Sequence, residues 1–464
     1  MKTRLAGVLG LLGLGLLMLC CCTGAPAQEA PAPPPKSGLE RFLEQDYLLG
    51  TWGGARTALS KRGVDFEFVY FGAVPSNVGG GIKQGSVYEG AFLMTLDLDS
   101  QKLAGYKGGT LHASSVSVHN GPEFSANYVG DLNKVSLLDF PDTFRLWELW
   151  YEQKFLDAKV SLKFGQLAID RDFIVPEYYN SIAGITLLNQ TFFYPTMAFN
   201  VYDIPGFPPR HHALASTPYG APGVRLRVDP APQYYAQAGV YDGNPDRSFS
   251  GTRIKLSKEE GALAYFETGY RLNPSTNDSG LPGSYKLGAY FHTGDFSDVY
   301  DTIAGMFGVT AGTQPPHPNN YGWYFLAEQM LYRELGKEDP AQQGLVGFFR
   351  VAGAPKDRNL AQFGVDGGVV YKGLIPKRDW DTLAVAGSYL EISDDIRRAQ
   401  RAANTVVPGS FVVSDYEAVV EVCYKAQMTA WWTVQPSVQR VFHPGGSQAI
   451  HDAWAVIVMS TLRF

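Results

Sequence analysis

Charged side chains recur at every second position in several segments of this chain, and that spacing limits the chemistry they can do. Arg225 and Arg227 alternate with Val224, Leu226 and Val228. Successive side chains of a β-strand point to opposite faces, so one face of this segment is basic and the other apolar. Burying both arginines in a dry core without partners would be costly, so the pattern predicts a water-filled interior.

Two uses of such interior charges stay open. Arg225 and Arg227 could donate hydrogen bonds to a polar solute, or they could form a ladder of ion pairs with Glu148, Glu417 or Glu421 across the interior. Arg350 belongs to the same set of candidate interior residues. Mixed signs of charge on one surface would order water and favour neutral polar solutes over ions.

The connection 167–222 is far longer than a typical loop, and loops of that length are usually functional or disordered. Its aromatic residues, Tyr178 and Phe192 among them, argue against disorder. We expect the loop to fold inward and line a constriction; the alternative is an outward fold over the mouth. The charged candidates within it are Asp170, Arg171, Asp172, Glu177 and Arg210.

Enzymatic and metal chemistry are poorly supported. Asp170 and Asp172 could serve as an acid/base pair for glycoside hydrolysis, but on an extended segment Arg171 lies between them and favours ion pairing. His211 and His212 are adjacent, so on an extended chain they point opposite ways, and no third ligand is near. We expect no enzyme activity, no metal and no cofactor.

The composition favours β-structure and gives no support to nucleic-acid binding. Charged residues make up 18% of the chain and aromatic residues 13%, and the net charge is -6. Many aromatics with few charges suit strands that have a lipid-facing side. A nucleic-acid-binding protein would usually show a basic surface instead.

The first 27 residues are typical of an export signal. Lys2 and Arg4 precede an apolar stretch, Leu5–Leu19, and Ala25–Ala27 forms a small-residue cleavage site. The alternative is a lipoprotein acylated within Cys20–Cys22, although large residues precede the first cysteine.

Three further segments follow the signal peptide 1–27. Residues 28–37 are a Pro-rich tether. Residues 38–63 predict a helical periplasmic segment, since its apolar residues share one face and Gly63 is a natural stop. Residues 64–464 predict a β-barrel that includes the inward-folding loop 167–222.

Alternating apolar and polar residues mark about 16 strand-length runs from Val64 onward. The connections between them alternate in length, which fits the short periplasmic turns and long outer loops of outer-membrane barrels. The predicted fold is therefore an all-β, antiparallel, up-and-down transmembrane barrel. The runs are 64–73, 88–98, 109–118, 144–153, 158–166, 223–229, 233–241, 261–271, 283–293, 321–333, 343–352, 361–371, 379–392, 413–425, 429–441 and 452–464.

The last run ends on an aromatic residue. Trp454, Val456, Val458, Leu462 and Phe464 share one face, with an apolar character suited to lipid. A terminal aromatic on such a strand resembles the outer-membrane assembly signal, so we assign that role to Phe464. The expected partners are therefore outer-membrane lipid and the barrel assembly machinery.

Seven motifs, in order along the chain, resemble the carbohydrate-selective porin family, OprB. The resemblance covers essentially residues 45–464. The motifs are Leu48–Gly54 with Arg56, Phe164–Leu167, Ala238–Pro245, Leu281–Lys286, Gln329–Glu334, Gly373–Pro376 and Trp432–Pro436.

The resemblance implies a 16-stranded outer-membrane barrel that passes mono- and oligosaccharides by facilitated diffusion, with loops narrowing the pore. Sugars are neutral and rich in hydroxyls, so charged groups and aromatic faces inside the pore could bind them. Two other functions stay open: a structural or adhesive barrel without selective transport, and a soluble exported lectin or hydrolase.

Overall fold

The computed structural model describes residues 37–179, 185–193, 217–253, 260–275, 278–310, 315–334 and 343–464. Residues from Phe42 onward form one compact unit. Arg210, His211 and His212 lie outside the described residues. Among the described helices, none is both long and apolar enough to cross a membrane.

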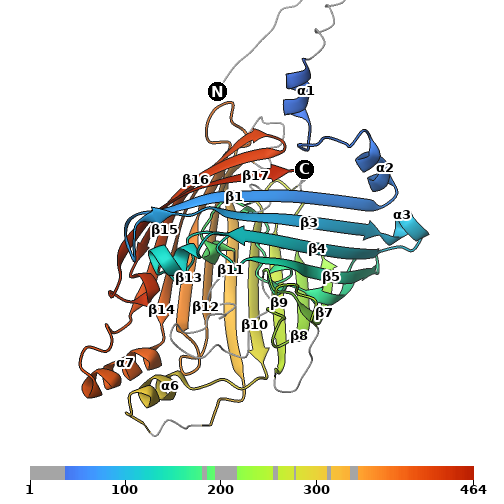
Figure 1. Cartoon of the computed structure of the whole chain (residues 1–464). Coiled ribbons are helices and arrows are strands. Elements are labelled where there is room, and N and C mark those ends of the chain that lie inside the picture. Colours follow the sequence, from blue (N-terminus) through green and yellow to red (C-terminus); the bar gives the residue numbers. More distant parts are fainter. Residues whose placement is uncertain are drawn as a thin grey trace, which may run out of the picture. The chain divides into compact units, whose positions relative to one another are not determined.

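One antiparallel sheet closes on itself, because the first strand pairs with the last over Val69–Gly81 and His451–Arg463 (Figure 1). The predicted barrel is confirmed: the described residues form sixteen long strands and one additional strand, β2, of only two residues. The strands are β1 Val64–Gly81, β2 Gly85–Ser86, β3 Glu89–Asp99, β4 Gly109–Asn120, β5 Thr143–Phe155, β6 Val160–Leu167, β7 Ala221–Ala231, β8 Tyr234–Asp242, β9 Ala262–Leu272, β10 Gly283–His292, β11 Asn320–Arg333, β12 Gly344–Gly353, β13 Ala361–Lys372, β14 Thr382–Ile392, β15 Tyr416–Thr429, β16 Trp432–Phe442 and β17 His451–Arg463.

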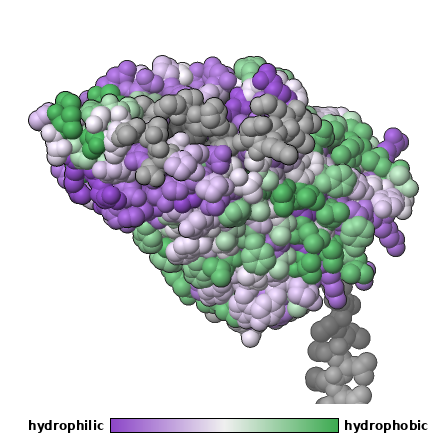
Figure 2. All heavy atoms as spheres, turned by 90° about the horizontal axis from the view of Figure 1, so that it is seen from below, coloured by the Kyte–Doolittle hydropathy of each residue, from purple (hydrophilic) through white to green (hydrophobic). Residues whose placement is uncertain are grey.

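Residues alternate between the two sides of the wall as the sequence predicts. Val224 and Leu226 are 42% and 47% exposed on the outside, whereas Arg225 between them is 4% exposed. The same alternation places Val458 outside and Ile457 inside. Figure 2 shows large apolar areas on the surface that are separate from the polar areas. An apolar outer wall around a polar interior is what a barrel in lipid requires.

The helices differ from the prediction. Residues 38–62 form two short helices rather than one, because Gly50, Gly53 and Gly54 lie between them with φ of 59°, 65° and 94°. Two further helices in the long connections 293–319 and 393–415 pack against each other at the end of the barrel away from the C-terminus (Figure 1). Within the described residues, the α-helices are α1 Gly38–Glu44, α2 Ala55–Lys61, α3 Ser100–Ala104, α6 Val299–Met306 and α7 Asp394–Val406.

The segment before β1 fastens the seam between the first and last strands. Arg56 donates hydrogen bonds to the main-chain oxygens of Phe66 in β1 and Phe464 after β17, each at 2.5 Å. Its guanidinium lies 3.5 Å from the centre of the Tyr47 ring. The amide of Leu48 donates to the carbonyl of Arg463 at 2.8 Å. The Leu48–Gly54 motif with Arg56 therefore bridges both ends of the closed sheet.

Candidate functional site

Two connections lie against the inner wall and are bonded to each other. These two inward segments are residues 121–142, between β4 and β5, and, after β6, the described residues 168–179 and 185–193. The Asn189 side chain donates to the carbonyl of Asn133 at 2.8 Å, and the Gln190 amide donates to the carbonyl of Lys134 at 2.9 Å. Gln439 of β16 joins both connections, since it accepts from Asn189 and donates to the carbonyl of Val135. The two segments thus form one unit inside the sheet.

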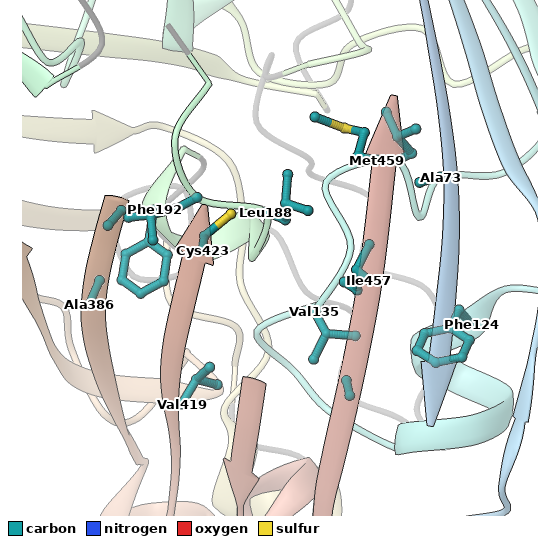
Figure 3. Close-up of a cluster of buried hydrophobic side chains, with 14 of the residues drawn as sticks. Ala73, Phe124, Val135, Leu188, Phe192, Ala386, Val419, Cys423, Ile457 and Met459 are labelled. Carbon is teal, nitrogen blue, oxygen red and sulfur yellow. The ribbon is translucent and has the colours of Figure 1, made fainter. Parts of the chain in front are cut away.

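Apolar side chains hold this unit against the wall. Leu188 and Phe192 of one connection and Val135 of the other lie beside Cys423 and Ile457 of the strands (Figure 3). All five side chains are at most 1% exposed. Their burial stabilises the inward position of both connections. Cys423 is accordingly a packing residue of this cluster.

Arg225 pairs with different carboxylates from those the sequence suggested. Its guanidinium lies 2.8 Å from Glu152 and 3.4 Å from Asp172, and it contacts neither Glu148, Glu417 nor Glu421 in any described ion pair. Asp172 also binds the amine of Lys163 at 2.7 Å. These buried pairs join the connection after β6 to strands β5, β6 and β7.

Asp170, Arg171 and Asp172 do not form the extended segment we expected. Residues Ile169–Arg171 are a turn of 3-10 helix, so the side chains diverge. Asp170 accepts from the amide and hydroxyl of Thr217; burial raises its pKa, and those bonds oppose the rise. Arg171 lies 3.8 Å from Glu148 and keeps a side chain that is 56% exposed. Asp170 and Asp172 thus bond to different partners.

A partly exposed group of charges surrounds Tyr235. Arg227 binds both carboxylate oxygens of Asp229, at 2.7 and 3.0 Å, and lies 4.0 Å from the centre of the Tyr235 ring. Arg271 reaches Asp229 at 3.3 Å and Glu177 at 2.8 Å. The side chains of these four charged residues are 20–27% exposed.

Glu177 connects this group to the inward segment. Lys286 lies 3.1 Å from its carboxylate, and Arg271 donates to it. Burial alone would raise the pKa of Glu177, but the two cations outweigh that effect and hold the pKa below its usual value. The carboxylate is therefore charged at neutral pH and ties residue 177 to β9 and β10.

The remaining candidates hold the inward segments instead of facing open space. Arg350 is 2% exposed, binds Asp366 at 3.0 Å and donates to the carbonyl of Thr191. Glu417 accepts from the amides of Leu132 and Asn133 at 2.7 and 2.6 Å. Glu421 accepts from those of Leu188 and Asn189 at 2.7 and 3.0 Å.

Sequence reasoning missed one residue of this site, Arg271. It lies on the inward face of β9, so the period of two could have identified it. Asp229 shares the interior face of Arg225 and Arg227 by the same alternation, and Glu177 belongs to the expected charged residues of the long connection. Within the described residues, no group of three or more His, Cys, Asp or Glu is arranged to hold a metal ion.

Comparisons with known proteins agree with this fold. The family described as "Carbohydrate-selective porin, OprB family" matches residues 83–464. Porin B of Pseudomonas aeruginosa is 28% identical over 463 residues, covering 96% of this chain and 93% of that protein. The Putative porin QuiX of Acinetobacter baylyi is 23% identical over 449 residues, covering 91% and 94%.

A solved structure is also similar. The high-pH structure of Pseudomonas putida OprB superposes with a TM-score of 0.78 at 24% identity, covering 91% of this chain and all of that one. At that identity the likeness supports the fold, whereas the family match extends over most of the sequence. The chain belongs to the carbohydrate-selective porin family, OprB.

Proposed function

We propose that this chain is a Gram-negative outer-membrane porin through which small neutral sugars diffuse, and that its two inward segments narrow the pore. Membership of the carbohydrate-selective porin family supports the sugar substrate and the location. A closed sheet with an apolar outer wall supports a pore in lipid. The family assignment favours a channel over an enzyme.

The observation that carries this proposal is the mixed-sign group around Tyr235. Arg227, Asp229, Arg271 and Glu177 are paired with one another yet remain partly exposed. Such a surface offers hydrogen-bond donors and acceptors to sugar hydroxyls. Because its positive and negative charges balance, it attracts neither cations nor anions strongly. We assign these residues, together with the exposed Arg171, to sugar contact.

The other predicted site residues take a supporting role in this proposal. Asp170, Asp172, Glu148 and Arg225 hold the start of the segment after β6. Arg350, Glu417 and Glu421 hold its later part and the segment before β5. These residues affect the width of the pore by positioning the inward segments, without contacting a sugar themselves.

Export and assembly complete the proposal. Residues 1–27 direct export as a signal peptide, 28–37 form a tether, 38–63 lie on the periplasmic side, and the barrel 64–464 contacts outer-membrane lipid. The barrel assembly machinery recognises the last strand through Phe464.

Swelling of liposomes that contain the purified protein tests the function. Vesicles diluted into an iso-osmotic monosaccharide should swell quickly, and those in an anionic solute of equal size should swell more slowly. Equal rates for both solutes would contradict the preference for neutral sugars. A folded barrel that permits no swelling would support the structural or adhesive alternative.

A further inference from the structure

Four glutamates of the inner wall share an unusual environment. Glu267 of β9, Glu328 of β11, and Glu417 and Glu421 of β15 are each at most 1% exposed. Each accepts hydrogen bonds from main-chain amides of the inward segments. Burying a carboxylate costs free energy unless hydrogen bonds satisfy it. Four buried glutamates that all accept from loop main-chain amides therefore call for a physical reason.

Glu328 makes the most extensive of these contacts. It accepts from three successive amides, those of Glu177 at 2.7 Å and of Tyr178 and Tyr179 at 3.1 Å. Successive amides that point the same way form a concave donor site, and the two oxygens of a carboxylate match it. The main chain is thereby fixed next to Glu177, which belongs to the sugar-contact group proposed above.

Glu267 fixes the same segment three residues earlier. Its carboxylate accepts from the amide of Ile174 at 2.9 Å, and from Tyr235, Gln237 and Tyr324 at 2.8–3.0 Å. The hydroxyls and the amide side chain hold the carboxylate itself in place. Residues 174–179 are therefore clamped at both ends by two rigid strands.

Glu417 and Glu421 couple the two inward segments. They lie four residues apart on the inner face of β15 and grip different connections: Glu417 holds Leu132 and Asn133, and Glu421 holds Leu188 and Asn189. Because Asn189 also bonds to Asn133, movement of one segment would pull on the other.

We propose that Glu267, Glu328, Glu417 and Glu421 are positioning residues that set the width and the sugar selectivity of the pore. This inference rests on the proposed porin function. Glu328, Glu417 and Glu421 each fix two or more main-chain nitrogens of the inward segments at hydrogen-bond distance from the wall. Glu267 fixes one such nitrogen, that of Ile174, and accepts three further bonds from side chains of the wall. Loop segments that are held at several points on rigid strands keep a constriction more constant than apolar packing alone does.

Two substitutions of Glu328 separate position from charge. Glu328→Gln keeps the size of the side chain but replaces one acceptor oxygen with an amide NH2 group, which cannot accept from the main-chain N–H groups of the loop. Glu328→Asp keeps the charge but withdraws the carboxylate by one carbon–carbon bond, about 1.5 Å. Glu391→Gln is the control, because it removes the same charge from β14 at a residue paired with Arg397.

Single-channel conductance and sugar block in a planar bilayer provide the readout, with a monosaccharide as the probe. Both Glu328 variants should conduct more current than the parent and bind the blocking sugar about tenfold more weakly, an energy of about 1.4 kcal/mol. Glu391→Gln should match the parent. If Glu328→Gln alone changes conductance, the effect is one of charge and the proposal is wrong.

A second readout covers loss of folding and separates this inference from the porin function. Tyr178→Cys should react faster with a thiol reagent when Glu328→Gln is added, because residue 178 is then held less firmly. The native Cys423 is buried and should contribute little labelling of its own. An unchanged labelling rate in folded protein would overturn the positioning role.

If a Glu328 variant does not fold, Glu421→Gln and Glu421→Asp take its place. Absence of sugar block in the parent would reject sugar selectivity, while the conductance comparison would still test the glutamates.

Discussion

Removal of the Arg56 guanidinium should loosen the seam of the barrel without altering the pore. Arg56→Met keeps a side chain of similar length but deletes both donors to the oxygens of Phe66 and Phe464. A hydrogen bond from a charged donor contributes about 1.5–3 kcal/mol, and the Arg56 side chain is largely buried. The loss of two such bonds therefore suggests a decrease of about 3–6 kcal/mol in the free energy of unfolding.

Urea unfolding of the protein in phospholipid vesicles, followed by tryptophan fluorescence, measures this loss. Arg62→Met is the matched control, because Arg62 is exposed at the end of the same short helix. Arg56→Met should lower the urea midpoint and the control should not, while conductance stays at the parent value in both. A midpoint equal to the parent's would refute the idea that Arg56 joins β1 to the C-terminal end.

Three further outcomes follow from the same structure. Val458→Arg places a charge on the lipid side of β17 and should cost about 2–4 kcal/mol near the bilayer midplane, measured by urea unfolding in vesicles; an unchanged stability would mean that this position does not face lipid. Arg227→Ala should weaken sugar block about tenfold, or about 1.4 kcal/mol, in bilayer recordings of folded protein, and unaltered block would remove it from the sugar-contact group. Because the pKa of Glu177 is lowered, its bonds to Arg271 and Lys286 should persist at neutral pH and weaken as pH falls through that lowered pKa, so sugar block should decline only in acid. Glu177→Gln should abolish this acid step, and a step of the same size in that variant would assign it to another group.

The strands were predictable because a membrane barrel imposes one rule on each of them. An apolar residue must face lipid and the next must face the interior, so Val224 and Arg225 identify their own sides. The period of two holds along most of the long strands and is interrupted at bulges, as in β5, where both Trp147 and Glu148 are buried. Strand ends differ from prediction mainly where β1 continues to Gly81. Side-chain direction in the wall is thus a property of local sequence.

The interior arrangement was not predictable in the same way. Arg225 faces inward as expected, but its partners Glu152 and Asp172 depend on where the segment after β6 lies. Glu421 was expected to line the pore and instead accepts amides of Leu188 and Asn189, more than two hundred positions earlier. Such contacts arise from tertiary packing, which no spacing within one strand encodes. The sequence reasoning did not predict helices α6 and α7. Both are short and lie in long connections between strands, where each buries only a few apolar residues.

Single-channel recording of the purified parent protein, with a neutral monosaccharide titrated into the bath, tests the sugar-porin function most directly. We predict stepwise conductance that falls saturably as sugar is added, because the sugar occupies the partly exposed charges beside the inward segments. Conductance that does not change at any sugar concentration would contradict a sugar-binding constriction, and a folded protein without conductance would contradict the pore itself.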